Sequence, residues 1–169
     1  MKVILYMAIT PNGLIAKEND DTSFVTKRDW KSFLSMVKKF GHVVIGRRTY
    51  DVTDPEEFVK SSLYVVMTHK KSLRKKTPKV IFTDKSPKNI VKMLGSMGFK
   101  KILIAGGGNL NSAFMKAGLV DEMYLDVEPT LLGKGIKVFA DANFEAKLKL
   151  VGTKKLSKNE IQLHYKVLK

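Results

Sequence analysis

Short apolar runs alternate with helical patterns along most of this chain, and no other feature restricts its possible fold as strongly. Each run is rich in Val, Ile and Leu, and several end at a glycine or proline turn, as buried strands do. These runs cover residues 3–9, 43–45, 63–67, 80–82 and 101–105. The spacing of apolar residues predicts helices at 27–40, 87–97 and 109–117, with Thr26 and Ser86 as N-caps of the first two.

The C-terminal part of the chain changes character. Residues 122–128, 146–151 and 161–167 are predicted to be strands, and no long helical pattern separates them. A β/α series that ends in hairpin-like strands indicates an α/β fold with a mostly parallel central sheet, helices on both faces and an antiparallel C-terminal edge. With 169 residues and no low-complexity linker, the chain is expected to form one domain over residues 1–169.

Composition excludes several classes of protein. The chain has no cysteine, which excludes disulfide scaffolds, thiolate metal sites and cysteine nucleophiles. Its three histidines, at positions 42, 69 and 164, are isolated, so no metal site is expected. No run approaches the roughly 18 apolar residues of a membrane span, and the opening run is too short for a signal peptide. We therefore expect a cytoplasmic protein that does not bind membranes.

The net charge of +15 predicts an attraction to anions, either nucleic acid or small phosphorylated ligands. Lysines scattered through every segment are more typical of a solvated surface than of a binding site. The densest basic stretch, residues 69–76, lacks the interleaved aromatic residues of a single-strand binding surface. No nucleic-acid partner is expected, although a basic nucleic-acid-binding domain stays open as an alternative.

Four turns lie at the carboxyl ends of the predicted strands, where α/β sheets bind ligands. In the segment 46–50 (G-R-R-T-Y) two of the four arginines follow a strand directly, and guanidinium groups match the geometry of phosphate oxygens. Thr49 is expected to cap a helix there. The glycines at 106–108 would let the backbone approach a diphosphate closely. A Walker motif is absent, and Asn111 stands where a Rossmann fingerprint requires its third glycine.

Asp29 is the candidate carboxylate of this cleft. It falls in the first turn of the helix predicted at 27–40, and it shares a stripe of that helix with Phe33, Met36 and Phe40. An acidic residue in a first turn also favours the helix dipole, which is the plain structural explanation. Beside two aromatic rings, however, desolvation would raise the pKa of Asp29 and suit it to proton handling or to binding an amidine-like ring edge.

Three segments together resemble the dihydrofolate reductase superfamily. Residues 8–19 resemble the first strand and active-site loop of dihydrofolate reductases, including their I-x-x-E-N run at 15–19. Residues 46–50 resemble their G-R-x-T-[WY] turn, and residues 104–108 resemble their glycine turn for the cofactor. The segments 118–122 and 129–135 are more similar to the riboflavin-biosynthesis reductase branch of the same superfamily. The order and spacing of these segments agree over most of the chain.

The resemblance implies hydride transfer from NADPH to a small pterin or folate substrate. By resemblance, Ala8 and Ile15 would line the nicotinamide pocket, and residues 16–24 would close over it. The other implied cofactor-binding residues are Arg47, Arg48, Thr49, Thr68, His69, Lys70, Ala105, Gly106, Gly107, Gly108, Asn109 and Leu110, with a cis peptide between Gly106 and Gly107. Asp29 would be the catalytic acidic residue, and the substrate would meet Ala8, Phe33, Thr49, Lys60 and Asp126.

The sequence departs from this pattern at the folate tail. The arginine that usually binds the tail is missing, because Ser61 and Ser62 stand there, and Lys60 offers only a point charge. Asp126 replaces a common threonine, and two neighbouring carboxylates would raise the pKa of one of them. Dihydrofolate reduction is the main expectation, and reduction of the riboflavin-pathway phosphoribosylaminopyrimidine is the alternative. A monomer and a homodimer both stay open.

Overall fold

The computed structural model describes residues 1–54, 59–70 and 79–169. The strands are β1 (Lys2–Ile9), β2 (Leu14–Ala16), β3 (His42–Gly46), β4 (Leu63–Met67), β5 (Val80–Thr83), β6 (Lys101–Ile104), β7 (Val120–Val127), β8 (Ile136–Lys137), β9 (Lys147–Lys155) and β10 (Ile161–Leu168). The helices are α1 (Lys27–Phe40), α2 (Arg47–Val52), α3 (Pro87–Ser96) and α4 (Gly108–Lys116).

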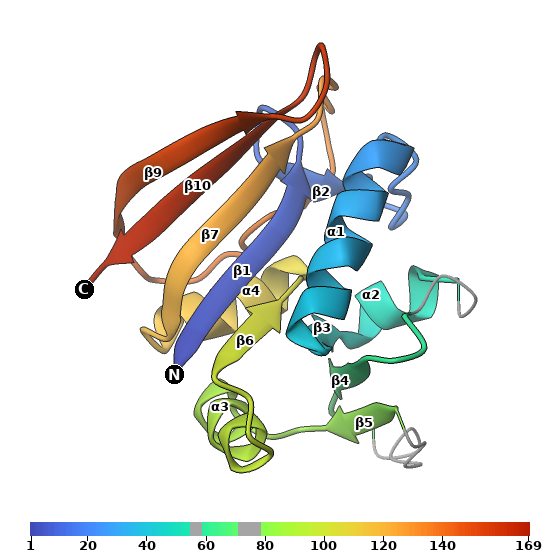
Figure 1. The fold of residues 1–169 in the computed structure, drawn as a ribbon. Helices are drawn as coiled ribbons and strands as arrows, with labels where there is room; N and C mark the ends of the chain where they lie inside the picture. Colours follow the sequence, from blue (N-terminus) through green and yellow to red (C-terminus); the bar gives the residue numbers. More distant parts are fainter. Residues whose placement is uncertain (55–58, 71–78) are drawn as a thin grey trace.

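A mixed sheet runs through the fold in the order β5-β4-β3-β6-β1-β7-β10-β9 (Figure 1). The pairs from β5 to β7 are parallel, whereas β10 is antiparallel to β7 and β9 is antiparallel to β10. This confirms the predicted fold class, including its antiparallel C-terminal edge. The carboxyl ends of β1, β3 and β6 consequently lie side by side in the middle of the sheet.

Helices cover both faces of the parallel part of the sheet. Side chains of a strand alternate between faces, so Val43 and Ile45 pack in one apolar cluster with Val37 of α1, while Val44 packs in the other. That second cluster includes Ile90 and Leu94 of α3 and residues of α4. Because each face is covered, the strands are continuous apolar runs, the pattern from which they were predicted.

The helix ends follow local signals. The Oγ1 atom of Thr26 accepts a hydrogen bond from the Asp29 amide at 3.1 Å, and α1 ends at Gly41, whose φ of 72° suits glycine. Ser86 caps α3 in the predicted way, with Pro87 as the first helical residue. Both caps were predicted from the sequence, and both are confirmed.

The local structure differs from the sequence-based predictions at several points. Thr49 does not cap the helix after β3: α2 begins at Arg47 with Gly46 at the cap position, so Thr49 lies inside the helix. The ribbon of β2 and β8 was not predicted, because strands of three and two residues carry no visible period. Strand β7 begins at Val120 and ends at Val127, which leaves Glu128 outside the strand.

Strand β9 forms the outer edge of the sheet and is exposed along its whole length. Figure 1 shows β9 and β10 extending away from the helices. Its apolar residues Leu148, Leu150 and Val151 are therefore open to solvent, and its backbone is held by the ladder to β10.

Candidate active site

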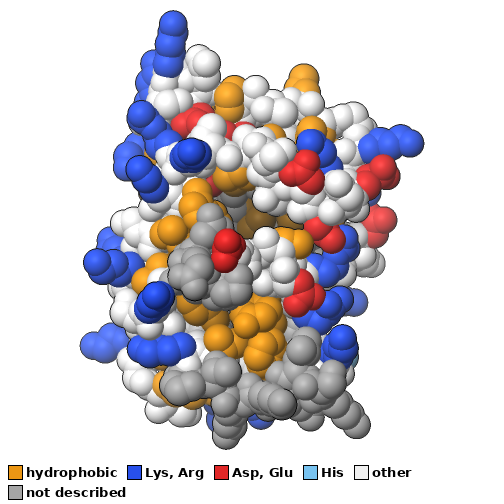
Figure 2. All heavy atoms as spheres, turned by 90° about the vertical axis from the view of Figure 1, so that its right-hand side faces the viewer, with side chains coloured by type: hydrophobic (Ala, Val, Ile, Leu, Met, Phe, Trp, Pro, Cys, Tyr) orange, Lys and Arg blue, Asp and Glu red, His pale blue; other side chains and the backbone are white. Residues whose placement is uncertain are grey.

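A cavity of about 330 Å³ opens beside α1 at the carboxyl ends of β1, β3 and β6. Much of its wall is apolar and comes from α1, where the Phe33 ring lies 5.3 Å from the Trp30 ring and 5.8 Å from the Tyr6 ring. Figure 2 shows apolar side chains in a hollow near the middle of the face that carries α1 and α2. Such walls suit a flat ring.

Several residues that the sequence singled out come together in this cavity. They are Ala8, Ile15, Asp29, Phe33, Thr49 and Ala105. They come from five different elements or turns, and they meet because parallel strands end at the same edge of the sheet. Their shared position fits the predicted cleft, while the role of each residue stays a prediction.

Asp29 supplies the buried carboxyl group of the cavity. It lies in the first turn of α1 and is only 3% exposed. Its Oδ1 atom is buried and has no hydrogen-bond partner among the described residues. A buried polar atom without a partner is costly, so Asp29 is an unusual residue for the wall of a cavity and a candidate functional residue.

Asp126 is a buried residue of β7 and does not belong to the cavity lining. In the register of the sheet it stands between Ala8 of β1 and Gln162 of β10. Its Oδ2 atom accepts a hydrogen bond from the Tyr6 hydroxyl, and its Oδ1 atom accepts one from Gln162 Nε2 at 2.7 Å. Asp126 is not among the residues that line the cavity, and its role as a substrate contact stays a prediction.

Two further carboxyl groups are buried nearby, at Glu128 and Glu160. Glu128 Oε1 accepts hydrogen bonds from the amide and hydroxyl of Thr26, at 3.0 and 3.4 Å. Burial, the hydrogen bond to Asp126, and the charges of Asp126, Glu128 and Glu160 raise the pKa of Asp29 to about 9. The predicted effect of two neighbouring carboxylates is confirmed in direction, and Asp29 is neutral near pH 7.

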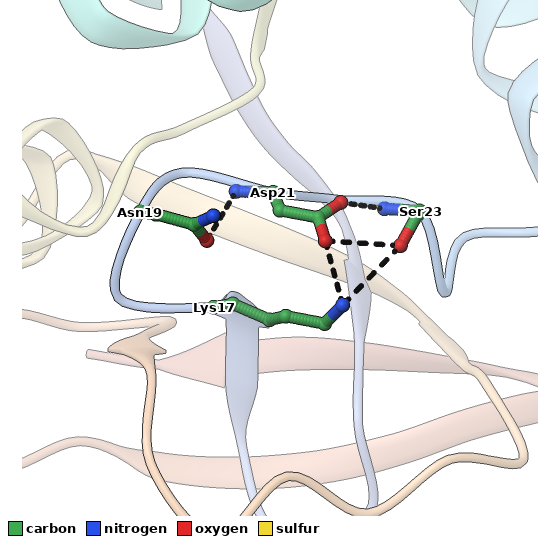
Figure 3. A network of polar contacts seen from close by, with 4 residues as sticks. All are labelled: Lys17, Asn19, Asp21 and Ser23. Carbon is green, nitrogen blue, oxygen red and sulfur yellow. Dashed lines mark hydrogen bonds and ion pairs between the residues drawn. The ribbon is translucent and has the colours of Figure 1, made fainter.

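The loop between β2 and α1 closes one side of the cavity with Thr22 and Val25. Its own polar side chains hold it together, as Figure 3 shows. Lys17 Nζ lies 2.6 Å from Asp21 Oδ2, and the Ser23 amide donates to Asp21 Oδ1 at 2.7 Å. These residues belong to the segment 16–24, which by resemblance would close over the nicotinamide pocket.

Two glycine turns meet at the edge of the cavity. The Gly46 amide donates a hydrogen bond to the Gly106 carbonyl at 2.7 Å, which joins the ends of β3 and β6. The peptide between Gly106 and Gly107 is cis, as the resemblance implies. Helix α4 begins at Gly108 and has no side-chain cap, so the first amides of α4 are available to an anion. Among them are the backbone groups of Asn109 and Leu110, and the Leu110 side chain is buried in the core.

Other predicted phosphate contacts already have protein partners. Arg47 pairs with Asp51, and the Arg48 guanidinium lies 2.6 Å from Asp20 Oδ1. Thr68 is buried, and its Oγ1 atom accepts from the Lys70 amide at 3.1 Å. His69 and Lys70 are exposed at the end of β4, and residues 71–76 of the basic stretch lie outside the described residues.

Lys60, predicted to substitute for the missing arginine, is exposed and is not part of the cavity lining. In contrast, Lys27 at the start of α1 does line the cavity. Tyr6, Trp30, Glu160 and Gln162 were not predicted from the sequence as residues of the site. Tyr6 carried a usable signal, because it shares a strand face with Ala8. Glu160 and Gln162 carried no sequence signal, because the pairing of β10 with β7 is what brings them to the site.

Within the described ranges, no group of three or more His, Cys, Asp or Glu side chains is arranged to hold a metal ion. The same part of the chain contains no helix long and apolar enough to cross a membrane.

Comparison with known proteins gives a family match over almost the whole chain. The model of the RibD C-terminal domain matches residues 1–162. The uncharacterized protein YwjB of Bacillus subtilis (strain 168) is 29% identical over an alignment of 171 residues, which covers 97% of this chain and 97% of YwjB.

Solved structures with the same fold include two connected by name with riboflavin biosynthesis. One is a protein of Shewanella sp. PV-4 provisionally assigned to riboflavin biosynthesis, with a TM-score of 0.81, 21% identity and full coverage of both chains. The other is the Thermotoga maritima diaminohydroxyphosphoribosylaminopyrimidine deaminase/5-amino-6-(5-phosphoribosylamino)uracil reductase, with a TM-score of 0.79 and 20% identity. The match to it covers 99% of this chain and 56% of the Thermotoga chain. At these identities the likeness shows the fold.

Proposed function

The chain belongs to the RibD C-terminal domain family, and on that premise we propose that it is an NADPH-dependent reductase of an aminopyrimidine that carries a ribose phosphate. The observation that carries the proposal is a ring-sized apolar cavity with a buried carboxyl group, set beside two glycine turns that suit a diphosphate. Of the two branches that the sequence resembles, the family match favours the riboflavin branch. Dihydrofolate reduction therefore becomes the second candidate.

The glycine turns fit a dinucleotide cofactor. A Cβ atom added to Gly107 would lie 3.7 Å from Thr49 Oγ1 and 3.9 Å from Ile15 Cδ1, in the space between the turn and the cavity wall. The amides at the start of α4 would hold the diphosphate, and Arg47 and Arg48 would reach phosphates by leaving Asp51 and Asp20. Thr68, His69 and Lys70 would meet the 2′-phosphate. NADPH, when bound, supplies the hydride.

The remaining residues would bind and orient the pyrimidine. Phe33 and Trp30 would stack against the ring, and the loop carrying Thr22 and Val25 would exclude water. Lys27, the basic residue among the described cavity-lining residues, would contact the ribose phosphate. Asp29 is neutral near pH 7, so it holds a proton at its carboxyl group close to the bound pyrimidine.

Dihydrofolate is supported by one observation, the side-by-side position of Asp29 and Phe33 in the cavity. Against it stands the folate tail. Ser61 and Ser62 precede β4, where the usual arginine would be, and Lys60 does not line the cavity. The two substrates therefore predict opposite outcomes in one assay.

The test measures NADPH oxidation from the change in absorbance, with 5-amino-6-(5-phosphoribosylamino)uracil as the substrate and, in a separate assay, with dihydrofolate. We expect turnover with the pyrimidine and little with dihydrofolate. The variant Asp29→Asn should lower kcat about a hundredfold, because it removes the carboxyl proton, whereas Asp141→Asn, an exposed carboxylate, should match the wild type. Turnover with dihydrofolate alone would reverse the order of the two candidates. If neither substrate supports NADPH oxidation, both candidates are refuted.

A further inference from the structure

We propose that the ion pair between Asp20 and Arg48 is a latch at the edge of the cavity, and that a phosphate group of the ligand opens this latch by taking Arg48 from Asp20. Asp20 is then a specificity-determining residue, which favours ligands that carry phosphate. The inference rests on the proposed function, because the proposed cofactor and the proposed substrate both carry phosphate groups.

The pair joins two separate walls of the cavity. Asp20 lies in the loop between β2 and α1, and this loop lines the cavity with Thr22. Arg48 lies in α2, and the residue that follows it, Thr49, also lines the cavity. Neither Asp20 nor Arg48 is among the described residues of the lining, so their pair connects the loop to α2 from outside the cavity.

The contact between the two side chains is bidentate. Arg48 Nε donates a hydrogen bond to Asp20 Oδ2 at 3.1 Å, and Arg48 Nη2 lies 2.6 Å from Asp20 Oδ1. Two parallel contacts fix the orientation of both groups. A guanidinium edge that is bound to a carboxylate in this way is not available to a phosphate, so the two anions compete for Arg48.

Asp20 is the residue through which the middle of the loop is tied to α2. Among the described residues, the other hydrogen bonds and ion pairs of residues 18–24 stay within the segment 17–25, and Figure 3 shows the network that they form. The ends of the loop are held separately, by the β2–β8 ribbon and by the Thr26 amide, which donates to Glu128. Loss of the tie to α2 therefore leaves the loop organised but free to move as a unit.

The backbone at Asp20 supports a role for its carboxylate. Asp20 has a φ of 65°, and it is the only residue other than glycine with a positive φ among those that the structure describes. Glycine or asparagine would suit this conformation at least as well. The local fold therefore does not require an aspartate here, whereas the contact with Arg48 does.

The pair is open to solvent and therefore exchangeable. The exposed fraction is 56% for the Arg48 side chain and 28% for the Asp20 side chain. Exposed ion pairs are weak and are screened by salt, and a phosphate group has more charge and more acceptor oxygens than one carboxylate. The neighbouring pair of Arg47 and Asp51 is exposed too, but both of its residues lie in α2, so it does not hold the loop.

The first measurement is the quenching of Trp30 fluorescence by acrylamide in the protein without ligand. Trp30 is the only tryptophan of the chain and lines the cavity, and acrylamide is neutral, so a change in protein charge does not attract or repel it. Asp20→Asn suits the positive φ and should raise the quenching constant about two- to fivefold, the effect of one exposed ion pair. Asp51→Asn removes the same charge from the neighbouring pair and should leave quenching unchanged.

Salt provides an independent check on the same signal. At about 1 M salt, exposed charges are screened over roughly 3 Å, so the wild type should approach the quenching constant of Asp20→Asn. Asp20→Asn should itself respond little. A wild type that does not respond to salt would overturn the latch, as would unchanged quenching in Asp20→Asn or an equal change in Asp51→Asn.

The second measurement is the affinity for NADPH, NADH and ribose 5-phosphate, determined by calorimetry. Asp20→Asn leaves Arg48 without a competing carboxylate, so the affinity should rise about two- to fivefold for the ligand whose phosphate takes Arg48. A gain for NADPH alone identifies the 2′-phosphate, a gain for both dinucleotides identifies the diphosphate, and a gain for ribose 5-phosphate alone identifies the substrate phosphate. Arg48→Gln should bind the same ligand more weakly than the wild type.

The control for affinity is Glu122→Gln, which removes a carboxylate that pairs with Lys2 at the opposite end of β1 from the cavity and should give no gain. Once the ligand is saturating, the wild type and Asp20→Asn should be quenched equally, because Arg48 has left Asp20. A persisting difference, no gain for any of the three ligands, or an equal gain in Glu122→Gln would overturn the release of the latch by phosphate.

The outcome is separate from that of the reductase assay. NADPH oxidation with unchanged quenching in Asp20→Asn would refute the latch alone. The expected changes in quenching and affinity without NADPH oxidation would refute the proposed function alone.

Discussion

Asp29 joins binding and stability in one residue. Asp29 is suited to the cavity by its burial and by the neighbouring carboxyl groups. The same two features lower the free energy of unfolding, because they disfavour the ionised form of Asp29 in the folded protein. Residues with strongly raised pKa values are often found at functional sites, because selection for function keeps residues that lower stability. This has a measurable consequence for the pH dependence of unfolding.

We expect Asp29→Asn to stabilise the protein by roughly 1–3 kcal/mol at pH 8, and by less at pH 5. The pKa of Asp29 is raised from 3.8 to about 9, so between these values the folded state holds a proton that the unfolded chain releases. The contribution of Asp29 to stability therefore falls as the pH rises from about 4 to about 9. Asparagine does not titrate, so the variant does not lose stability in this way as the pH rises. Urea unfolding at both pH values measures the difference.

The exposed Asp141 provides the matched comparison. A hydrogen bond from Lys137 lowers the pKa of Asp141, so this carboxylate is ionised at both pH values. Asp141→Asn should show no gain at pH 8 over pH 5. An Asp29→Asn variant that gains no more at pH 8 than at pH 5 would contradict the raised pKa of Asp29.

At the scale of single elements, the turn after β6 combines two constraints at Gly106. Its φ is 75°, and a Cβ atom there would lie 2.9 Å from Met7 Sδ. We expect Gly106→Ala to destabilise the protein by about 2–3 kcal/mol and to weaken NADPH binding, because the turn must shift. Gly98, with a φ of 90° and open space around it, isolates the backbone effect.

Gly98→Ala should therefore cost only about 1 kcal/mol and leave NADPH binding unchanged. Thermal unfolding and titration with NADPH measure both effects. Equal losses of stability and of NADPH affinity in the two variants would show that the contact with Met7 has no part in the turn.

The elements differ in how far the sequence predicts them. Helix α1 was predicted to the residue, because the cap, the apolar spacing and the terminal glycine are local signals. The start of α2 was not, because Gly46 caps that helix with no side chain and Thr49 resembled a cap. The ribbon of β2 and β8 depends on contacts between segments about 120 residues apart, and such contacts leave no local pattern.

The candidate site divides in the same way. Asp29 and Phe33 could be paired from the sequence because they lie four residues apart on one helix. Asp126 was noticed only through the resemblance, and its support by Gln162 depends on the antiparallel register of β10. A one-residue slip of that register would move Gln162 to the other face, so no local pattern could have placed it.

At the scale of the whole molecule, charge controls the exposed sheet edge. Strand β9 offers an unpaired backbone edge and apolar side chains, features that promote pairing between molecules. Its lysines and the net charge of +15 oppose that pairing. We expect replacement of the four β9 lysines by glutamine to raise the average mass in sedimentation velocity as protein concentration increases. The four are Lys147, Lys149, Lys154 and Lys155.

The matched control removes the same charge from other elements, at Lys31, Lys88, Lys92 and Lys116. It should sediment like the wild type at every concentration. Association of both variants to the same extent would attribute the effect to net charge and not to the edge, and association of neither would refute the role of the β9 lysines.

The exposed β9 also bears on the temperatures at which the protein can work. The turn that follows β9 carries Glu160, one of the charges that keep Asp29 neutral, and the Leu156 carbonyl that binds Arg28 of α1. A strand that buries no side chains and is held by one ladder is among the first elements to open on warming. Once it opens, water reaches Glu160 while the core is intact. The contact between the last hairpin and α1 would then loosen on warming before the core melts.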